Sequence, residues 1–195
     1  RSYQLSYESI IDDPYYITYT GYGEAKTMNF IKRAFGAIFD FLQGIVVILA
    51  IMVMIYLFVM SPQEINGASM EPNFHNGEFI LTNKVLYRFQ NPQRGDIVIF
   101  KSPRNKDIDY IKRIIGLPGE TVLLKDNTLW VNGQRVGEPY LDPGTPIFGG
   151  TYLRENQPMV VPPGEYFVAV DNRSHSSDSR DFGPIAKEVF IGIAF

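Results

Sequence analysis

The sequence predicts a mainly β domain preceded by one transmembrane helix. Two observations predict this fold class: a long uncharged apolar run near the N-terminus, and a series of short apolar segments behind it that turn residues separate. The 195-residue chain is 45% hydrophobic and 20% charged, which is near-average usage and enough for one sizeable core. A disordered tail and a collagen-like fibre are therefore excluded.

The apolar run covers residues 45–60 (IVVILAIMVMIYLFVM) and contains no charged side chain. With Phe41 and Leu42 it reaches roughly twenty residues, or about 30 Å of helix, which matches the hydrocarbon thickness of a bilayer. We predict a transmembrane helix at residues 38–60. A buried core helix is one alternative, but such helices normally keep a polar stripe. A cleavable signal peptide is another, but the run is long for one and no A-x-A-like site follows it.

Basic residues flank the run on its N-terminal side. Lys26, Lys32 and Arg33 lie nearest to it on that side. The next basic residue after the run is Lys84. The positive-inside rule then predicts a single-pass protein of the cell membrane, with residues 1–37 in the cytoplasm and residues 61–195 forming an extracytoplasmic domain.

Residues 1–27 show neither a sustained helical period nor a strand period. They are interpreted either as a disordered cytoplasmic tail or as sequence upstream of a natural start at Met28. No function is assigned to them.

Beyond the apolar run, segments rich in Val, Ile, Phe and Tyr have strand length and are separated by Gly, Pro and Asn. They are residues 78–81, 96–101, 121–124, 129–131 and 166–170. This pattern predicts the mainly β domain. Residues 139–158 contain Pro and Gly without strand alternation and predict a long surface loop.

The composition limits which reactive groups and metal ligands the chain can supply. The chain has no Cys, which removes disulfides, thiol nucleophiles and thiolate metal sites, and its two His are too few for a His-rich zinc site. The formal net charge of −3 argues against a nucleic-acid partner. We therefore expect no metal, and a hydrolase would depend on Ser, Thr, Asp, Glu or Lys.

Four segments carry such residues beyond what packing needs. They are residues 67–72 (GASMEP), 94–100 (RGDIVIF), 110–120 (YIKRIIGLPGE) and 171–180 (DNRSHSSDSR). Ser69 lies in the first and Lys112, among large apolar neighbours, in the third. A buried lysine has a lowered pKa and can act as a base, and Ser–Lys pairs are a known variant of the serine hydrolase arrangement. An ordinary turn serine and an exposed strand lysine are the other interpretations.

In this order and behind an apolar span, the four segments resemble the boxes of type I signal peptidases, membrane-bound Ser–Lys endopeptidases that remove signal peptides from exported proteins. The resemblance covers residue 65 to about residue 192. It implies a signal-peptidase-like β catalytic domain that needs no cofactor. It also implies two partners, the signal peptides of exported preproteins and the lipid bilayer.

The resemblance also implies roles for single residues. Ser69 would be the nucleophile and Lys112 the general base. Ser176 would hydrogen-bond the lysine amine, and an ion pair of Asp178 with Arg180 would hold this segment against the lysine. A hydroxyl partner suits an amine that must stay neutral, whereas a carboxylate does not.

Two positions depart from the family pattern. Val170 stands where the family often has Gly. Gly67 stands where some members have a Ser whose hydroxyl helps to bind the oxyanion, so the oxyanion hole would use the Ser69 backbone N–H and a donor that the sequence does not identify.

The substrate would lie beside the catalytic pair. Small residues before the cut, the A-x-A pattern, need shallow apolar pockets, and the resemblance implies that these are lined by Ile65, Met70, Tyr110 and Ile111. An extended substrate could add as a strand along residues 64–67 and 109–111. The other interpretation of both segments is an ordinary sheet edge.

Several interpretations stay open. The aromatic residues Phe74, Phe79, Tyr87 and Phe89 are either membrane-interface or core residues. His75 and His175 are expected on the surface without a role. A non-catalytic membrane-tethered β module that binds exported peptides is the alternative function. Self-cleaving repressors share a related peptidase fold but carry a DNA-binding domain, where this chain has an apolar span.

Overall fold

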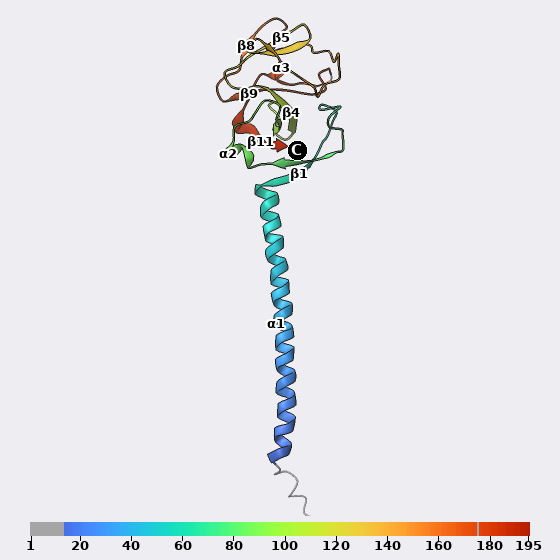
Figure 1. Ribbon diagram of the computed structural model, residues 1–195, viewed down its shortest axis with the longest axis vertical. Coiled ribbons are helices and arrows are strands. Elements are labelled where there is room, and N and C mark those ends of the chain that lie inside the picture. The colour runs from blue at the N-terminus through green and yellow to red at the C-terminus, as the bar shows by residue number, and fades with distance from the viewer. Residues whose placement is uncertain (1–13, 175) are drawn as a thin grey trace, which may run out of the picture. The chain divides into compact units, whose positions relative to one another are not determined.

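The computed structural model describes residues 14–174 and 176–195, with side chains from residue 27 onward (Figure 1). The chain divides into two compact units, of which the second is Met54–Phe195. Helix α1 (Pro14–Phe58) fills the described part of the first unit and enters the second. Its segment Thr27–Phe58 is long and apolar enough to cross a membrane, and all its side chains are exposed.

Helix α1 begins earlier than the sequence pattern indicates. Residues 14–27 are helical, although they show no helical period and are rich in Tyr, Thr and Gly. Adding a residue to an existing helix needs no new nucleus, so a strong helix can extend into a weak sequence. Residues 1–13, the rest of the segment interpreted as a tail, lie outside the described residues.

The second unit is built from antiparallel β-sheets, which confirms the predicted fold class. The larger sheet has the strand order β1-β2-β11-β3-β4-β9-β10. Its strands are β1 (Met60–Glu64), β2 (Phe79–Asn83), β3 (Ile97–Lys101), β4 (Asp109–Gly116), β9 (Glu165–Ala169), β10 (Ile185–Ala186) and β11 (Phe190–Ala194). Each of the predicted strand segments overlaps a strand of one of the two sheets, with bounds that differ by one or a few residues.

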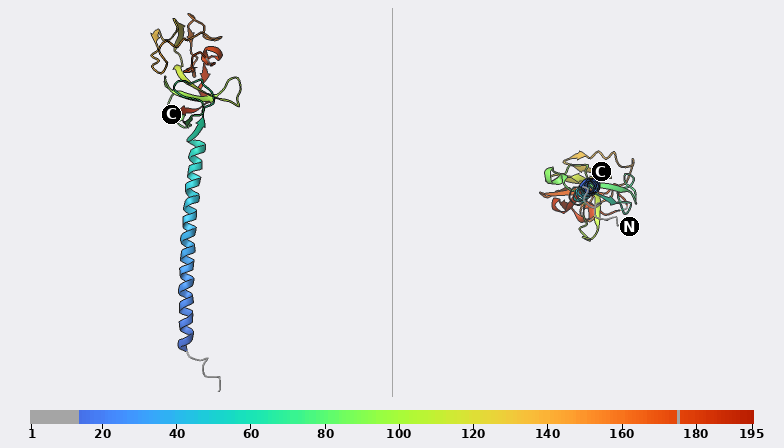
Figure 2. Two further views of the ribbon diagram at one scale, coloured as in Figure 1. Left: turned by 90° about the vertical axis from the view of Figure 1, so that its right-hand side faces the viewer. Right: turned by 90° about the horizontal axis from the view of Figure 1, so that it is seen from below.

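The smaller sheet has the order β7-β6-β5-β8. Its strands are β5 (Thr121–Lys125), β6 (Thr128–Val131), β7 (Gln134–Arg135) and β8 (Met159–Val160). Three short helical segments complete the unit: α2 (Leu86–Phe89), α3 (Ser179–Phe182) and the 3-10 turn η2 (Lys187–Val189). Figure 2 shows the ribbon in two further views, each turned by 90° from that of Figure 1.

Strand β4 joins separate parts of the core. Ile114 belongs to one cluster of buried apolar residues and its neighbour Ile115 to another, because successive strand residues point to opposite faces. Lys112, two residues before Ile114, lies on the same face as Ile114 and Tyr110. The strand therefore carries this lysine toward a packed apolar cluster that includes Phe100 and Val168.

Residues 139–158 have no regular strand, as predicted, but they are more than a surface loop. Ile147 and Leu153 are buried in the same cluster as Ile115. The backbone N–H groups of Tyr152 and Leu153 both donate to the carbonyl oxygen of Arg180. The buried apolar residues that hold this segment are spaced irregularly among Pro and Gly. They follow neither a strand period nor a helix period, so the sequence pattern does not reveal them.

The four aromatic residues that were interpreted as either membrane-interface or core residues divide into two groups. Phe74 and Tyr87 pack against core clusters, whereas Phe79 and Phe89 are 73% and 82% exposed. His75 is exposed, as expected, and pairs with Glu78. His175 lies outside the described residues.

Candidate active site

Lys112 is a buried cation on β4. The residue is only 3% exposed, and its Nζ donates to the carbonyl oxygen of Ile111 at 3.0 Å. The amine also lies 4.7 Å from the centre of the Tyr110 ring. No ion pair between Lys112 and a carboxylate occurs in the described part of the chain.

Burial lowers the pKa of Lys112 from its ordinary value of 10.5 to about 8. The cause is loss of hydration of the charged ammonium, which the negative charge of Asp178 opposes only in part. A substantial fraction of the amine is therefore neutral at mildly alkaline pH and can accept a proton.

Ser69 lies in the turn-rich connection between β1 and β2, and the neighbouring segments hold its backbone. Asn172 binds this turn twice: its backbone N–H donates to the Ser69 carbonyl oxygen at 3.0 Å, and its Nδ2 donates to the Ala68 carbonyl oxygen at 3.0 Å. Met70, the next residue after Ser69, is fully buried. The turn is thus fixed from both sides, with the partly exposed Ser69 between a buried anchor and the segment 171–180.

The two proposed catalytic side chains belong to elements that meet at the segment 171–180. Asn172 binds the Ser69 carbonyl oxygen, and the negative charge of Asp178 raises the pKa of Lys112. Among the described residues, no hydrogen bond joins Ser69 Oγ to Lys112 Nζ, nor Ser176 Oγ to that amine. The direct contacts that the resemblance implies are not formed in this structure.

Asp178 and Arg180 form the buried ion pair that the resemblance implies. Arg180 Nε and Nη2 donate to the two carboxylate oxygens at 2.8 and 2.9 Å. Asp178 also accepts from the backbone N–H groups of Val170 and Arg180, so its oxygens connect the residue that follows β9 to α3. Arg180 in turn donates to the carbonyl oxygens of Phe148 and Arg173.

A second hydroxyl lies in this segment. Ser177 Oγ is buried and has no hydrogen-bond partner in the described part of the chain. It directly follows Ser176, which was singled out by resemblance, and precedes Asp178. A buried polar atom without a partner lowers stability, so a hydrogen bond from this hydroxyl to another group would be favourable.

Arg113 and Asp171 form a further buried pair, to which the sequence analysis assigned no role. Arg113 Nε and Nη2 donate to the Asp171 carboxylate at 2.9 and 2.6 Å, and Asn73 Nδ2 donates to the same group at 2.9 Å. These residues neighbour Lys112 and Asn172. One feature of the sequence pointed to this pair: Arg113 lies in segment 110–120 and Asp171 in segment 171–180, both of which are rich in residues with reactive side chains.

Gly67 has φ +112°, a conformation that L side chains rarely adopt. Its N–H donates to Asn76 Oδ1 at 2.7 Å. A side chain at this position would be strained whatever space surrounds it. The backbone at this position therefore favours glycine over the serine that the resemblance allows here.

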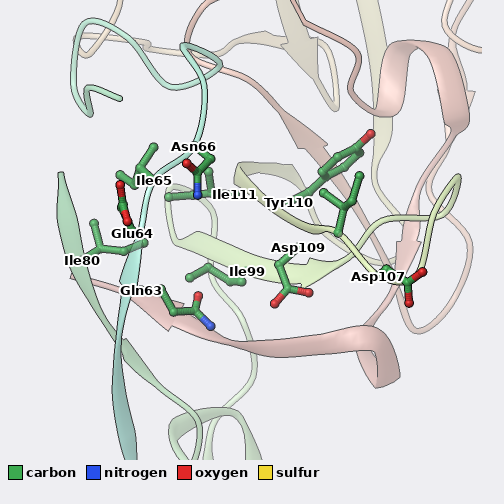
Figure 3. A pocket seen from close by; sticks show the side chains of 11 residues that line it. Gln63, Glu64, Ile65, Asn66, Ile80, Ile99, Asp107, Asp109, Tyr110 and Ile111 are labelled. Atoms are coloured by element: carbon green, nitrogen blue, oxygen red, sulfur yellow. The ribbon is translucent and has the colours of Figure 1, made fainter. Parts of the chain in front are cut away.

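A cavity of about 460 Å³ lies between β1 and β4 (Figure 3). Three of the four predicted pocket residues line it: Ile65, Tyr110 and Ile111. Met70 does not line it, because its side chain is fully buried beneath the turn. The remaining lining residues are Gln63, Glu64, Asn66, Ile80, Ile99, Asp107, Ile108 and Asp109.

The family model described as "Signal peptidase, peptidase S26" matches residues 38–195. Signal peptidase I V of Bacillus subtilis is 44% identical over 163 residues, which cover 80% of this chain and 95% of that protein. Signal peptidase IB of Staphylococcus aureus (strain COL) is 35% identical over 166 residues, 80% of this chain and 86% of that protein. A crystal structure of a signal peptidase I from Enterococcus faecalis is 36% identical, covers 53% of this chain and 97% of its own, and has a TM-score of 0.43.

The family match places the chain in the group described as "Signal peptidase, peptidase S26". More narrowly, the chain belongs to the signal peptidase I family. The resemblance stated from the four sequence segments is confirmed.

Proposed function

We propose that this protein is a membrane-anchored serine endopeptidase that cleaves signal peptides from exported preproteins after small residues, with Ser69 as nucleophile and Lys112 as general base. The burial of Lys112 carries this proposal. A lysine on a sheet strand normally extends into water and stays charged, and this one is 3% exposed with its pKa lowered to about 8.

In the proposed acylation step, neutral Lys112 Nζ removes the proton of Ser69 Oγ while this oxygen attacks the scissile carbonyl carbon. The Ser69 backbone N–H would stabilise the oxyanion. The lysine then gives its proton to the leaving amine as the peptide bond breaks. The products are the mature protein's free N-terminus and an ester between Ser69 and the signal peptide.

In the proposed deacylation step, the same neutral amine removes a proton from a water molecule that attacks the ester. Ser69 recovers its proton as the signal peptide leaves as a free acid. Ser176 and the unpartnered hydroxyl of Ser177 are the groups of segment 171–180 suited to orient the amine.

The cavity beside β4 suits an extended substrate. Residues 64–66 contribute to one wall and residues 109–111 to the other, and the walls combine isoleucine side chains with exposed polar groups. Backbone hydrogen bonds to the two segments would give affinity, and the apolar parts would accept small side chains at alternate positions.

The test is cleavage of a preprotein with an A-x-A site by the full chain in detergent or lipid. We expect cleavage by the wild type and by Lys125→Met, which removes an exposed lysine of the smaller sheet. Ser69→Ala and Lys112→Met should each reduce the rate by at least about a thousandfold. Equal cleavage by all four proteins would defeat the proposal, and absence of cleavage with retained peptide binding would favour the tethered binding module.

A further inference from the structure

A second cavity, of about 490 Å³, lies away from the proposed catalytic residues, between α2 and the region of η2 and β11. Helix α2 packs against β11, and Figure 1 shows the two elements side by side. The residues that line the cavity are Lys84, Tyr87, Arg88, Lys187, Glu188, Phe190 and Ile191. We call this the basic cavity.

The charge of the basic cavity is unbalanced. Three lining residues are cations and one, the exposed Glu188, is an anion. None of the three cations forms an ion pair with a carboxylate in the described part of the chain. Lys187 donates to neutral oxygens of Gln90 and Asn91, so its charge is held in place without being neutralised.

Another carboxylate, that of Asp96, lies near the cavity and is engaged elsewhere. It accepts from the Tyr87 hydroxyl at 3.0 Å and from the Gln93 backbone N–H at 2.9 Å. The basic cavity therefore has the charge to bind an anion.

The cavity also has apolar walls. The ring centroids of Tyr87 and Phe190 lie 6.0 Å apart, and both residues line the cavity together with Ile191. Two exposed apolar side chains adjoin the charged residues: Phe89, 82% exposed, follows Arg88, and Val189, 41% exposed, follows Glu188. Cations beside exposed apolar groups are typical of surfaces that lie at the boundary between lipid headgroups and acyl chains.

Lys84 links the cavity to residues 56–59, where the apolar segment ends within the second unit. Its Nζ lies 3.5 Å from the carbonyl oxygens of Tyr56 and Leu57, and its backbone N–H donates to Val59. The cavity therefore adjoins the last turn of α1. If this helix spans the bilayer, as the proposed function states, its end is the level at which lipid phosphates lie.

We propose that the basic cavity binds the phosphate of an anionic phospholipid headgroup, with Arg88 and Lys187 contacting the phosphate and Phe89 entering the acyl boundary. This inference rests on the membrane anchoring in the proposed function. A free phosphate would use the same cations, but it would make no use of the apolar residues that adjoin them.

The test uses the full chain in a neutral detergent, with lipid binding followed by native mass spectrometry. Phosphatidylglycerol and phosphatidylcholine are the probes, and inorganic phosphate is the competitor. The test variant is Arg88→Gln with Lys187→Gln. The control, Lys125→Gln with Arg135→Gln, removes two exposed cations from the smaller sheet.

We expect the wild type and the control to prefer phosphatidylglycerol over phosphatidylcholine, and the test variant to lose at least about tenfold in affinity for phosphatidylglycerol. Equal binding of this lipid by test and control variants would overturn the inference. Displacement of the lipid by inorganic phosphate at equal concentration would also overturn it, in favour of a site for free anions.

Cleavage of a signal-sequence peptide by the same preparations separates the two proposals. The test variant should cleave as fast as the wild type. Lipid preference without cleavage in the wild type would defeat the proposed activity alone, and cleavage without lipid preference would defeat the lipid site alone.

Discussion

Lys112 needs to lose its charge before it can act as a base, and its lowered pKa sets the pH at which this happens. The protonated amine cannot accept the Ser69 proton, so kcat/KM should rise with pH through about 8 and then level off. The measurement is kcat/KM for a signal-sequence peptide between about pH 6 and pH 10. A profile that is flat, or that falls through this range, would contradict a lysine base.

The same burial costs stability. The folded state holds Lys112 with a pKa of about 8 and the unfolded state has the ordinary value of 10.5, so the unfolded chain binds more protons between these two values. The destabilisation has its full size below about pH 8 and disappears as the pH rises toward 10.5. Lys112→Met should therefore raise the free energy of unfolding at pH 7 by up to about 3 kcal/mol.

Urea unfolding of the full chain in detergent at about pH 7 and pH 10 checks this. The gain from Lys112→Met should shrink at the higher pH, and the exposed Lys125→Met should show no such trend. A gain of the same size at both pH values would mean that packing, rather than charge, distinguishes the variant.

At the scale of elements, the Arg113–Asp171 pair joins β4 to the segment that holds the Ser69 turn. Asp171→Asn leaves a buried guanidinium without its counter-charge, which typically costs about 3–5 kcal/mol. We expect a loss of stability of this size and a fall in kcat larger than any rise in KM, because the two proposed catalytic residues lose their common support.

Lys101→Met is the matched control, because it breaks the partly exposed Lys101–Asp109 pair. Such exposed pairs contribute about 0–1 kcal/mol. Unfolding of both variants measures the loss of stability, and steady-state kinetics of Asp171→Asn measure the changes in kcat and KM. Equal losses of stability in the two variants would mean that the Arg113–Asp171 pair has no special role.

Gly192 lies on β11 where this strand runs close to the backbone of β2. A Cβ built on it would clash with the backbone carbonyl oxygen of Asn83, which cannot move without disturbing the sheet. Gly192→Ala should destabilise the protein by about 1–3 kcal/mol. Gly137→Ala, where a Cβ meets nothing within 4 Å, should be close to neutral in the same thermal unfolding experiment. A neutral Gly192→Ala would show that the two strands separate easily.

Sequence reasoning detected the elements better than their arrangement. Strands such as β3 and β9 are dense runs of Val, Ile and Phe between turn residues, so local composition identifies them. The position of β11 between β2 and β3 and the packing of Leu153 depend on contacts between distant residues, which no local period encodes. The Arg113–Asp171 pair spans 58 positions for the same reason.

For the whole molecule, the apolar segment Thr27–Phe58 and the basic residues before it predict the orientation of the β domain. Protease added outside sealed cells that contain the protein should digest residues 61–195 and spare the N-terminal segment. The control is the same digestion after permeabilisation, which should remove both. Full protection of residues 61–195 in sealed cells would contradict the proposed orientation.

Under the proposed mechanism, the strand order also determines when the protein can become active. Strand β11 lies between the hairpin β1–β2, which flanks Ser69, and the pair β3–β4, which carries Lys112, yet it follows both in the chain. In the proposed orientation, residues 61–195 cross the membrane with Ser69 and Lys112 ahead of this strand. The proposed activity should therefore begin only once β11 has been added to the sheet.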